Sequence, residues 1–153
     1  MAFGIESFKS MEIPVPEDEN IWLVPRTLFW TGEWKDAILV FTHKGIHFRV
    51  RKDKMIMADF SGGAITHSLL ENTFLAYNRI KSYQQGSLLW KNSMIIEMVD
   101  GLSLRFGFHK DMETVKRILW DNVRPDMPRD LQPYDYSSHH PENGPHRMIP
   151  VGR

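Results

Sequence analysis

The chain has 153 residues, of which 42% are apolar and 12% aromatic, which suits one globular domain with its own hydrophobic core. Its 19 basic residues equal its 19 acidic residues, so no overall charge favours nucleic acid or an anionic membrane. The absence of cysteine excludes disulfide-linked partners, thiolate nucleophiles and thiolate metal sites.

Residues 1–20 form an acidic segment that we expect to be extended and without fixed structure. They lack the basic start and the apolar run of a signal peptide. No apolar run in the chain reaches the roughly 18 residues that a transmembrane helix needs. The sequence therefore predicts a cytoplasmic protein.

The first strand is predicted at residues 21–30, where β-branched and aromatic residues are frequent. Pro25 cannot donate a hydrogen bond to a sheet, so we expect this strand to lie at an edge or to bend there. Residues 31–36 are polar apart from Trp34, and we interpret them as a loop.

A hairpin is predicted at residues 37–51, with Lys44-Gly45 supplying the positive φ angle of a tight turn. In the returning strand, apolar and basic residues alternate with a period of two, which directs one set to the core and the other to water. The set expected in water is His47, Arg49 and Arg51.

The next segment offers weaker signals. Residues 52–54 read as a turn and residues 55–60 as a short strand, while residues 64–76 fit either a short helix or a loop. Residues 79–84 are predicted as a further strand.

The region from residue 91 to 123 carries the clearest pattern. Residues 91–93 are expected to form a turn before a strand at 94–99, and Asp100-Gly101 is a strong hairpin signal. Residues 102–108 alternate as a half-buried strand does. A helix is predicted from Asp111, as N-cap, to Val123. Trp120 lies beside its apolar stripe and is expected at the seam between helix and sheet.

Residues 124–153 hold six of the nine prolines and few aliphatic residues, so we expect a mobile tail or one draped over the surface. The predicted organisation is an extended lead-in at 1–20, one domain at 21–123 and a proline- and histidine-rich tail at 124–153.

Two stretches carry a family resemblance. AILVFTHKGIHFRV, residues 37–50, is similar to the GRAM pattern of an apolar strand, a threonine before a tight turn, and a returning strand with phenylalanine. IKSYQQGSLLWKNSMIIEMVDGLSLRFGFHKDMETVKRIL, residues 80–119, resembles the remainder of that pattern, including its closing helix. The chain thus resembles the pleckstrin-homology superfold, and most closely its GRAM branch.

This resemblance implies a mainly β fold with one C-terminal helix, namely a partly open antiparallel barrel of about seven strands capped by that helix. Members of the superfold bind proteins or phosphoinositides. The sequence departs from phosphoinositide-binding members in the loop after the first strand, where Lys35 is the only basic residue.

A small basic cluster is the strongest charged feature. Guanidinium and ammonium groups at a strand end are suited to gripping phosphates, and a neighbouring indole suits a membrane interface. An ordinary solvated surface, with acidic side chains at the same end of the barrel, is the competing interpretation. The candidate ligand- or membrane-binding residues are Trp34, Lys35, Arg49, Arg51, Lys52 and Lys54.

No catalytic residue, metal site or cofactor is predicted. The chain lacks nucleotide-binding, zinc-protease and nucleophile-elbow motifs. Three of the seven histidines lie in the tail, and His43, His47 and His109 have no evident partner. We interpret these three as surface residues, and any metal binding by the histidines of the tail as adventitious.

The sequence therefore favours a non-enzymatic module that binds a protein partner, either by sheet-edge addition or through its tail. Recruitment to an anionic membrane or phosphoinositide is one alternative. A small-ligand barrel or an enzyme is the other.

Overall fold

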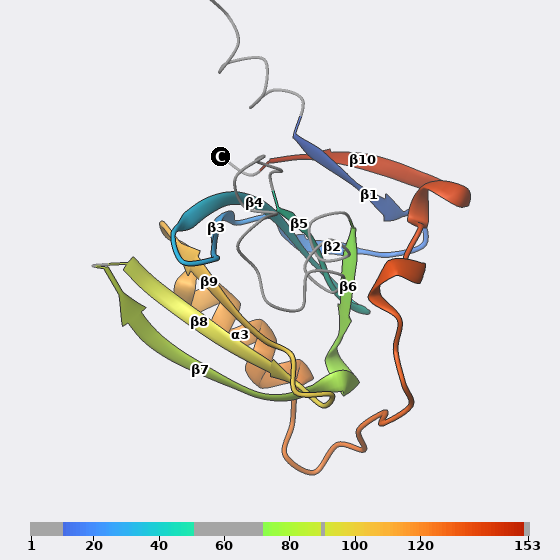
Figure 1. Cartoon of the computed structure of the whole chain (residues 1–153). Helices are drawn as coiled ribbons and strands as arrows, with labels where there is room; N and C mark the ends of the chain where they lie inside the picture. The colour runs from blue at the N-terminus through green and yellow to red at the C-terminus, as the bar shows by residue number, and fades with distance from the viewer. Residues whose placement is uncertain (1–10, 51–71, 90, 152–153) are drawn as a thin grey trace, which may run out of the picture.

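The computed structural model describes residues 11–50, 72–89 and 91–151. Within them a curled antiparallel sheet runs in the order β6-β5-β4-β3-β9-β8-β7, and β2 pairs with β4 beside this path (Figure 1). In this part of the chain one α-helix, α3, packs against the sheet, and the predicted mainly β fold with a C-terminal helix is confirmed. The strands are β1 Glu12–Pro16, β2 Ile21–Leu23, β3 Arg26–Trp30, β4 Trp34–Thr42, β5 Gly45–Val50, β6 Thr73–Ala76, β7 Ile80–Leu88, β8 Lys91–Met98, β9 Ser103–Phe108 and β10 His146–Pro150.

Pro25 divides the first predicted strand in two, as expected. β2 pairs with the end of β4, whereas β3 pairs with both β4 and β9. The predicted loop after β3 is wrong in its extent. A tight turn at residues 31–33 connects the strands, and Trp34 already pairs with Trp30 as the first residue of β4. Gly32 makes this turn short because its φ of 96° is readily accessible to glycine.

The hairpin of β4 and β5 is confirmed, but the reason for Gly45 is not the predicted one. Its φ is not positive, unlike that of Gly101, which has a φ of 92°. A Cβ on Gly45 would instead lie 2.5 Å from the backbone oxygen of Leu75. Glycine is therefore needed so that β6 can approach β5.

The other strand predictions meet mixed outcomes. Residues 73–76, left between helix and loop, form β6, because they pair with β5. The turn predicted at 91–93 is wrong, since Lys91 already pairs with Leu88 at the start of β8. The turn and strand predicted at 52–54 and 55–60 lie outside the described residues.

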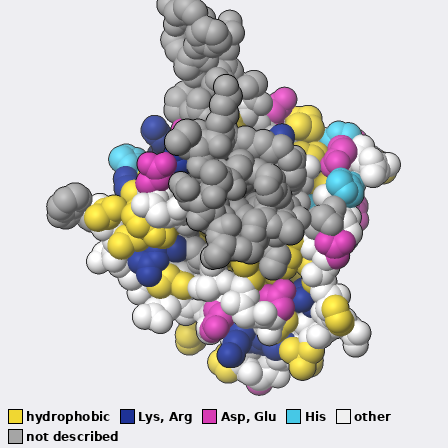
Figure 2. All heavy atoms as spheres, viewed as in Figure 1, with side chains coloured by type: hydrophobic (Ala, Val, Ile, Leu, Met, Phe, Trp, Pro, Cys, Tyr) yellow, Lys and Arg dark blue, Asp and Glu magenta, His cyan; other side chains and the backbone are white. Residues whose placement is uncertain are grey.

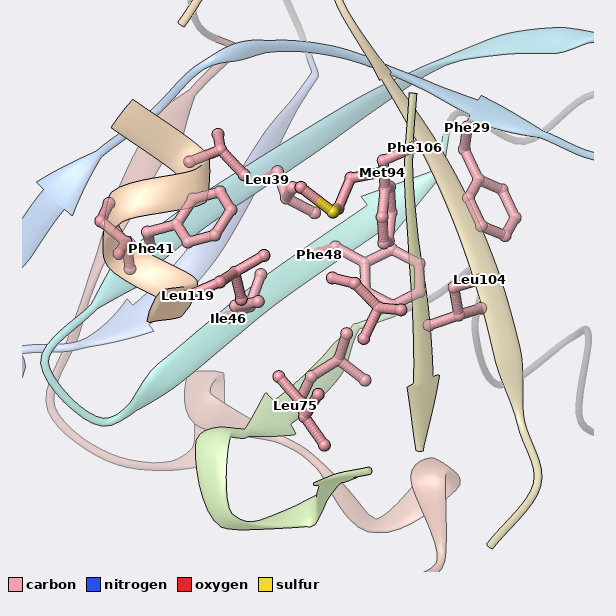
Figure 3. Close-up of a cluster of buried hydrophobic side chains, with 14 of the residues drawn as sticks. Phe29, Leu39, Phe41, Ile46, Phe48, Leu75, Met94, Leu104, Phe106 and Leu119 are labelled. Atoms are coloured by element: carbon pink, nitrogen blue, oxygen red, sulfur yellow. The ribbon is translucent and has the colours of Figure 1, made fainter. Parts of the chain in front are cut away.

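Helix α3, Met112–Asn122, closes the barrel as predicted. Leu119 has no exposed surface and packs in the cluster of Figure 3, which also includes Phe48 and Phe106. The helix has only 11 residues, and no described helix is long and apolar enough to cross a membrane.

Two details of the helix differ from prediction. Asp111 stands at the N-cap position, but its φ is 72° and its side chain makes no cap hydrogen bond. Trp120 is 72% exposed rather than packed at the seam, because the helix turns this side chain away from the core.

A second layer covers the outer face of the barrel. β1 and β10 form a two-stranded antiparallel sheet in which Ile13 is paired with Ile149 (Figure 1). Ile13 and Val15 pack against Ile38 and Val40 on the side of β4 that faces away from the barrel core. The expectations of an unstructured lead-in and a mobile tail are therefore wrong for residues 12–16 and 146–150.

The chain between α3 and β10 is also attached to the barrel. Arg79, which is 5% exposed, donates hydrogen bonds from Nη1 to the carbonyl oxygens of Asp130 (3.2 Å) and Gln132 (2.6 Å). Its guanidinium carbon also lies 5.1 Å from the centre of the Tyr134 ring. Tyr136 donates a 2.9 Å hydrogen bond to Asp100, whose other neighbours include Arg79. The tail is thus draped over the surface, which was one of the two predicted outcomes.

Candidate functional site

The predicted basic cluster is only partly described, and its described members are engaged. Arg49 donates a 3.0 Å hydrogen bond from Nη1 to the carbonyl oxygen of Glu12 in the covering layer. Lys35 forms a 2.7 Å ion pair with Glu33. Arg51, Lys52 and Lys54 lie outside the described residues.

Trp34 does not stand exposed beside these cations. Its ring lies edge-on to Trp30, with centroids 5.2 Å apart, and it covers Gly107 so closely that a Cβ there would lie 3.0 Å from the indole. On the face shown in Figure 2, basic and acidic side chains are scattered among apolar ones. Because three of its six residues lie outside the described part of the chain, the ligand- or membrane-binding surface stays a prediction.

A buried polar network is the first arrangement that sequence reasoning missed. His47 was expected in water, but its side chain is fully buried, because the covering layer and the tail lie over that face of β5. Its Nε2 lies 2.8 Å from Glu19, and its Nδ1 lies 3.2 Å from Nε2 of His139. Thr42 donates a 2.6 Å hydrogen bond to the same oxygen of Glu19.

The pKa values of this network follow from its surroundings. Burial would raise the pKa of Glu19, but the hydrogen bonds from His47 and Thr42 outweigh burial and lower it. Burial, assisted by the nearby His47, lowers the pKa of His139 to about 4. Which ring nitrogen donates in the contact between Nδ1 of His47 and Nε2 of His139 depends on the tautomer of each ring.

This network holds segments together, and the side chains of His47 and Glu19 within it are almost completely buried. The rings of Phe74 and His139 lie against His47, with centroids 4.6 Å and 5.2 Å away. Arg147 of β10 donates to the carbonyl oxygen of Glu19. Among residues 11–50, 72–89 and 91–151, no group of three or more His, Cys, Asp or Glu side chains could hold a metal ion.

The candidate site lies instead where α3 meets β7. Two hollows, of about 470 Å³ and 390 Å³, open on the two sides of the exposed Trp120 side chain. Tyr83 of β7 lines both hollows with Trp120. We call the surface formed by these two hollows the Trp120 groove.

The groove has an apolar floor and a charged rim. Met94, which is only 1% exposed, lines the smaller hollow, and the buried Val123 lines the larger one. Charged side chains of both signs surround them: Glu113, Lys116 and Arg117 at the smaller hollow, and Lys81, Asp121, Arg124, Asp126 and Arg129 at the larger one. A few charged groups around apolar and aromatic surface are typical of a binding groove.

β7 borders the groove as an edge strand. In the described part of the chain it pairs with β8 alone, from Ile80 to Leu88. On the other side of the strand, Arg129 donates a 2.7 Å hydrogen bond to the carbonyl oxygen of Ile80, at the beginning of β7. An edge strand presents unpaired backbone groups to which a further strand can add.

One signal for this site was present in the sequence, because Trp120 falls just outside the apolar stripe of α3. An exposed apolar side chain becomes informative where it belongs to a larger apolar surface. The spatial pairing of Trp120 with Tyr83 depends on how the helix crosses the sheet, which the spacing of residues does not specify.

No family model and no curated protein matches this chain. Among solved structures, the chain is similar to the C-terminal domain of an unknown protein from Leishmania infantum, with a TM-score of 0.51 and 10% sequence identity. The similarity covers 69% of this chain and 84% of that chain. At this identity it concerns the fold alone.

Proposed function

We propose that this chain is a non-enzymatic protein-interaction module, which binds an extended segment of a partner protein as an additional strand on β7. The carrying observation is the position of the Trp120 groove directly beside an edge strand. Main-chain hydrogen bonds to β7 would supply affinity, and the hollows on either side of Trp120 would select the side chains of the segment.

Trp120 is the residue that supports this proposal most strongly, because its side chain is exposed within the groove. Among the described residues, large exposed apolar side chains also include Trp22, Leu89, Leu131 and Met148, but none of these lines either hollow. Tryptophan is enriched among the residues that dominate binding energy at protein interfaces.

The order of strands and the closing helix also support membership of the pleckstrin-homology superfold, which we include in the proposal together with a cytoplasmic location. A membrane-binding role receives less support from the described residues, because Lys35 and Arg49 are already engaged. A ligand site inside the barrel receives little support, since the interior is filled by packed apolar side chains (Figure 3).

Selection of peptides tests the proposal. We would pan a phage library of random 12-residue peptides on the full chain and measure the affinity of enriched peptides by isothermal titration calorimetry. Trp120→Ala is expected to weaken binding by about thirtyfold, the cost of removing a central interface tryptophan. Leu131→Ala serves as the control, because Leu131 is 74% exposed and lies outside the groove.

Two outcomes count against the proposal. One is the absence of any enriched peptide, and the other is a set of peptides whose affinity is the same for wild type, Trp120→Ala and Leu131→Ala. Circular dichroism of each variant would show that the fold is retained, which the exposure of both side chains leads us to expect.

A further inference from the structure

One face of α3 forms a wall of the Trp120 groove. Glu113, Arg117 and Trp120 follow one another at intervals of four and three residues, and each of them lines at least one of the two hollows. Arg124, which lines the larger hollow, lies just beyond the end of the helix at Asn122. Residues at these intervals lie above one another on a helix. The helix therefore presents a second face, distinct from the buried one that contains Leu119.

The charged side chains around the groove differ in whether an opposite charge accompanies them. At the smaller hollow, Lys116 and Glu113 form an ion pair of 3.4 Å, which leaves Arg117 as an exposed cation without a partner in the described chain. At the larger hollow, the cations Lys81, Arg124 and Arg129 are accompanied by Asp121 and Asp126. Arg129 is half-buried and donates to backbone carbonyl oxygens, so the exposed charges there are Lys81, Arg124 and the two carboxylates. The smaller hollow thus has one uncompensated positive charge, whereas the exposed charges at the larger hollow are mixed.

We propose that the bound segment carries an acidic side chain that pairs with Arg117. This inference rests on the proposed function. An apolar side chain of the same segment packs against Trp120 and Met94, next to this acid. Arginine is suited to this role, because its planar guanidinium can bind a carboxylate through two hydrogen bonds.

The dimensions of the wall fit a short strand. From Glu113 to Asp121, the first and last residues of the helix that line the hollows, α3 rises by about 12 Å at about 1.5 Å per residue. Four residues of an added strand span about 13 Å. The recognised segment is therefore about four residues long.

The direction of the segment follows from the sheet. Every strand pair that involves β7, β8 or β9 is antiparallel, and an added strand would continue this pattern. Gln85 lines the smaller hollow and Lys81 the larger one, so an antiparallel segment enters at Arg117 and leaves at Arg124. The acidic residue accordingly precedes the apolar residue in the sequence of the partner.

The peptides selected on the full chain provide the test. After counter-selection on the Trp120→Ala variant, we expect the remaining peptides to share an Asp or Glu on the N-terminal side of an apolar residue. Arg117→Glu should weaken their binding at least fivefold, and replacing the acid of the peptide by its amide should have a similar effect. Arg26→Glu is the matched control, because Arg26 is exposed on β3 and lines neither hollow.

The outcomes separate this inference from the proposed function. Peptides that depend on Trp120 but lack the acid, or that bind Arg117→Glu as well as wild type, overturn the role of Arg117 and leave the groove intact. Peptides with the acid on the C-terminal side overturn the direction. If no selected peptide depends on Trp120, the proposed function fails, and the inference fails with it.

Discussion

Nδ1 of His47 lies 3.2 Å from Nε2 of His139, a residue 92 positions later in the chain. This contact joins the buried face of β5 to the tail, and Glu19 extends it to the segment between β1 and β2. Three distant parts of the sequence thus meet in one polar network, which ties the covering layer to the barrel.

Acidification should weaken this network. The pKa of His139 is about 4 in the folded chain and 6.5 as a free side chain, so the unfolded chain takes up the proton more readily. The free energy of unfolding should therefore fall as the pH drops from about 6.5 to about 4. The lowered pKa of Glu19 adds a further loss below its ordinary value of 4.5.

Urea titrations across this pH range would measure the effect. His139→Gln should flatten the slope between pH 6.5 and 4, whereas His109→Gln, which changes an exposed residue after β9, should keep it. Equal slopes for wild type and His139→Gln would show that His139 does not remain in the buried network.

Arg79 should be essential for the attachment of the tail. Arg79→Met keeps an unbranched apolar stem but removes the donors for the carbonyl oxygens of Asp130 and Gln132. We expect a loss of about 1.5–3 kcal/mol in the free energy of unfolding, since hydrogen bonds from a charged group are lost. Limited proteolysis should cleave the variant faster between α3 and β10. Unchanged cleavage would contradict the attachment.

Alanine substitutions at Leu119 and Trp120, which are neighbours in α3, should have very different effects on the free energy of unfolding. Leu119→Ala removes a fully buried side chain and should cost about 2–5 kcal/mol of stability. Trp120→Ala should change stability by less than about 0.5 kcal/mol, because surface substitutions have small effects. Chemical denaturation of the two variants would compare them directly, and a large cost for Trp120→Ala would mean that Trp120 serves the core rather than a partner.

The variants Gly45→Ala and Gly101→Ala should each be less stable than wild type, but for different reasons. Gly101→Ala meets no atom within 4 Å and is penalised only by its φ of 92°, which costs about 1–2 kcal/mol. Gly45→Ala places its Cβ against the backbone of β6 and should cost more. Thermal unfolding would rank the two variants, and equal melting temperatures would contradict the close approach of β6 to β5.

The fold was largely predictable because its signals are local. Alternation in residues 102–108, the Asp100-Gly101 turn and the helical stripe ending near Val123 each depend on a few neighbouring residues. Alternation also placed His47 and Arg49 correctly on the side of β5 that faces away from the barrel core. It could not show that this side is covered, because the cover comes from the two ends of the described chain.

The covering layer was not predicted because the sequence of β1 is not typical of a strand. β1 contains Pro14 and Pro16, and proline removes a backbone donor, which argues against a central strand but not against a strand paired on one side only. The alternation of Ile13 and Val15 was the available signal. The candidate site was missed for another reason, since the exposure of Trp120 is set by how α3 packs on the sheet.

Hydrogen–deuterium exchange on β7 tests the central claim most directly. In the free chain, the amides of residues 81–88 that face away from β8 should exchange quickly, because that side of the strand is an edge. Binding of a selected peptide should slow their exchange, as a new strand forms hydrogen bonds with them. If the peptide binds while exchange in residues 81–88 is unchanged, strand addition at the Trp120 groove is contradicted.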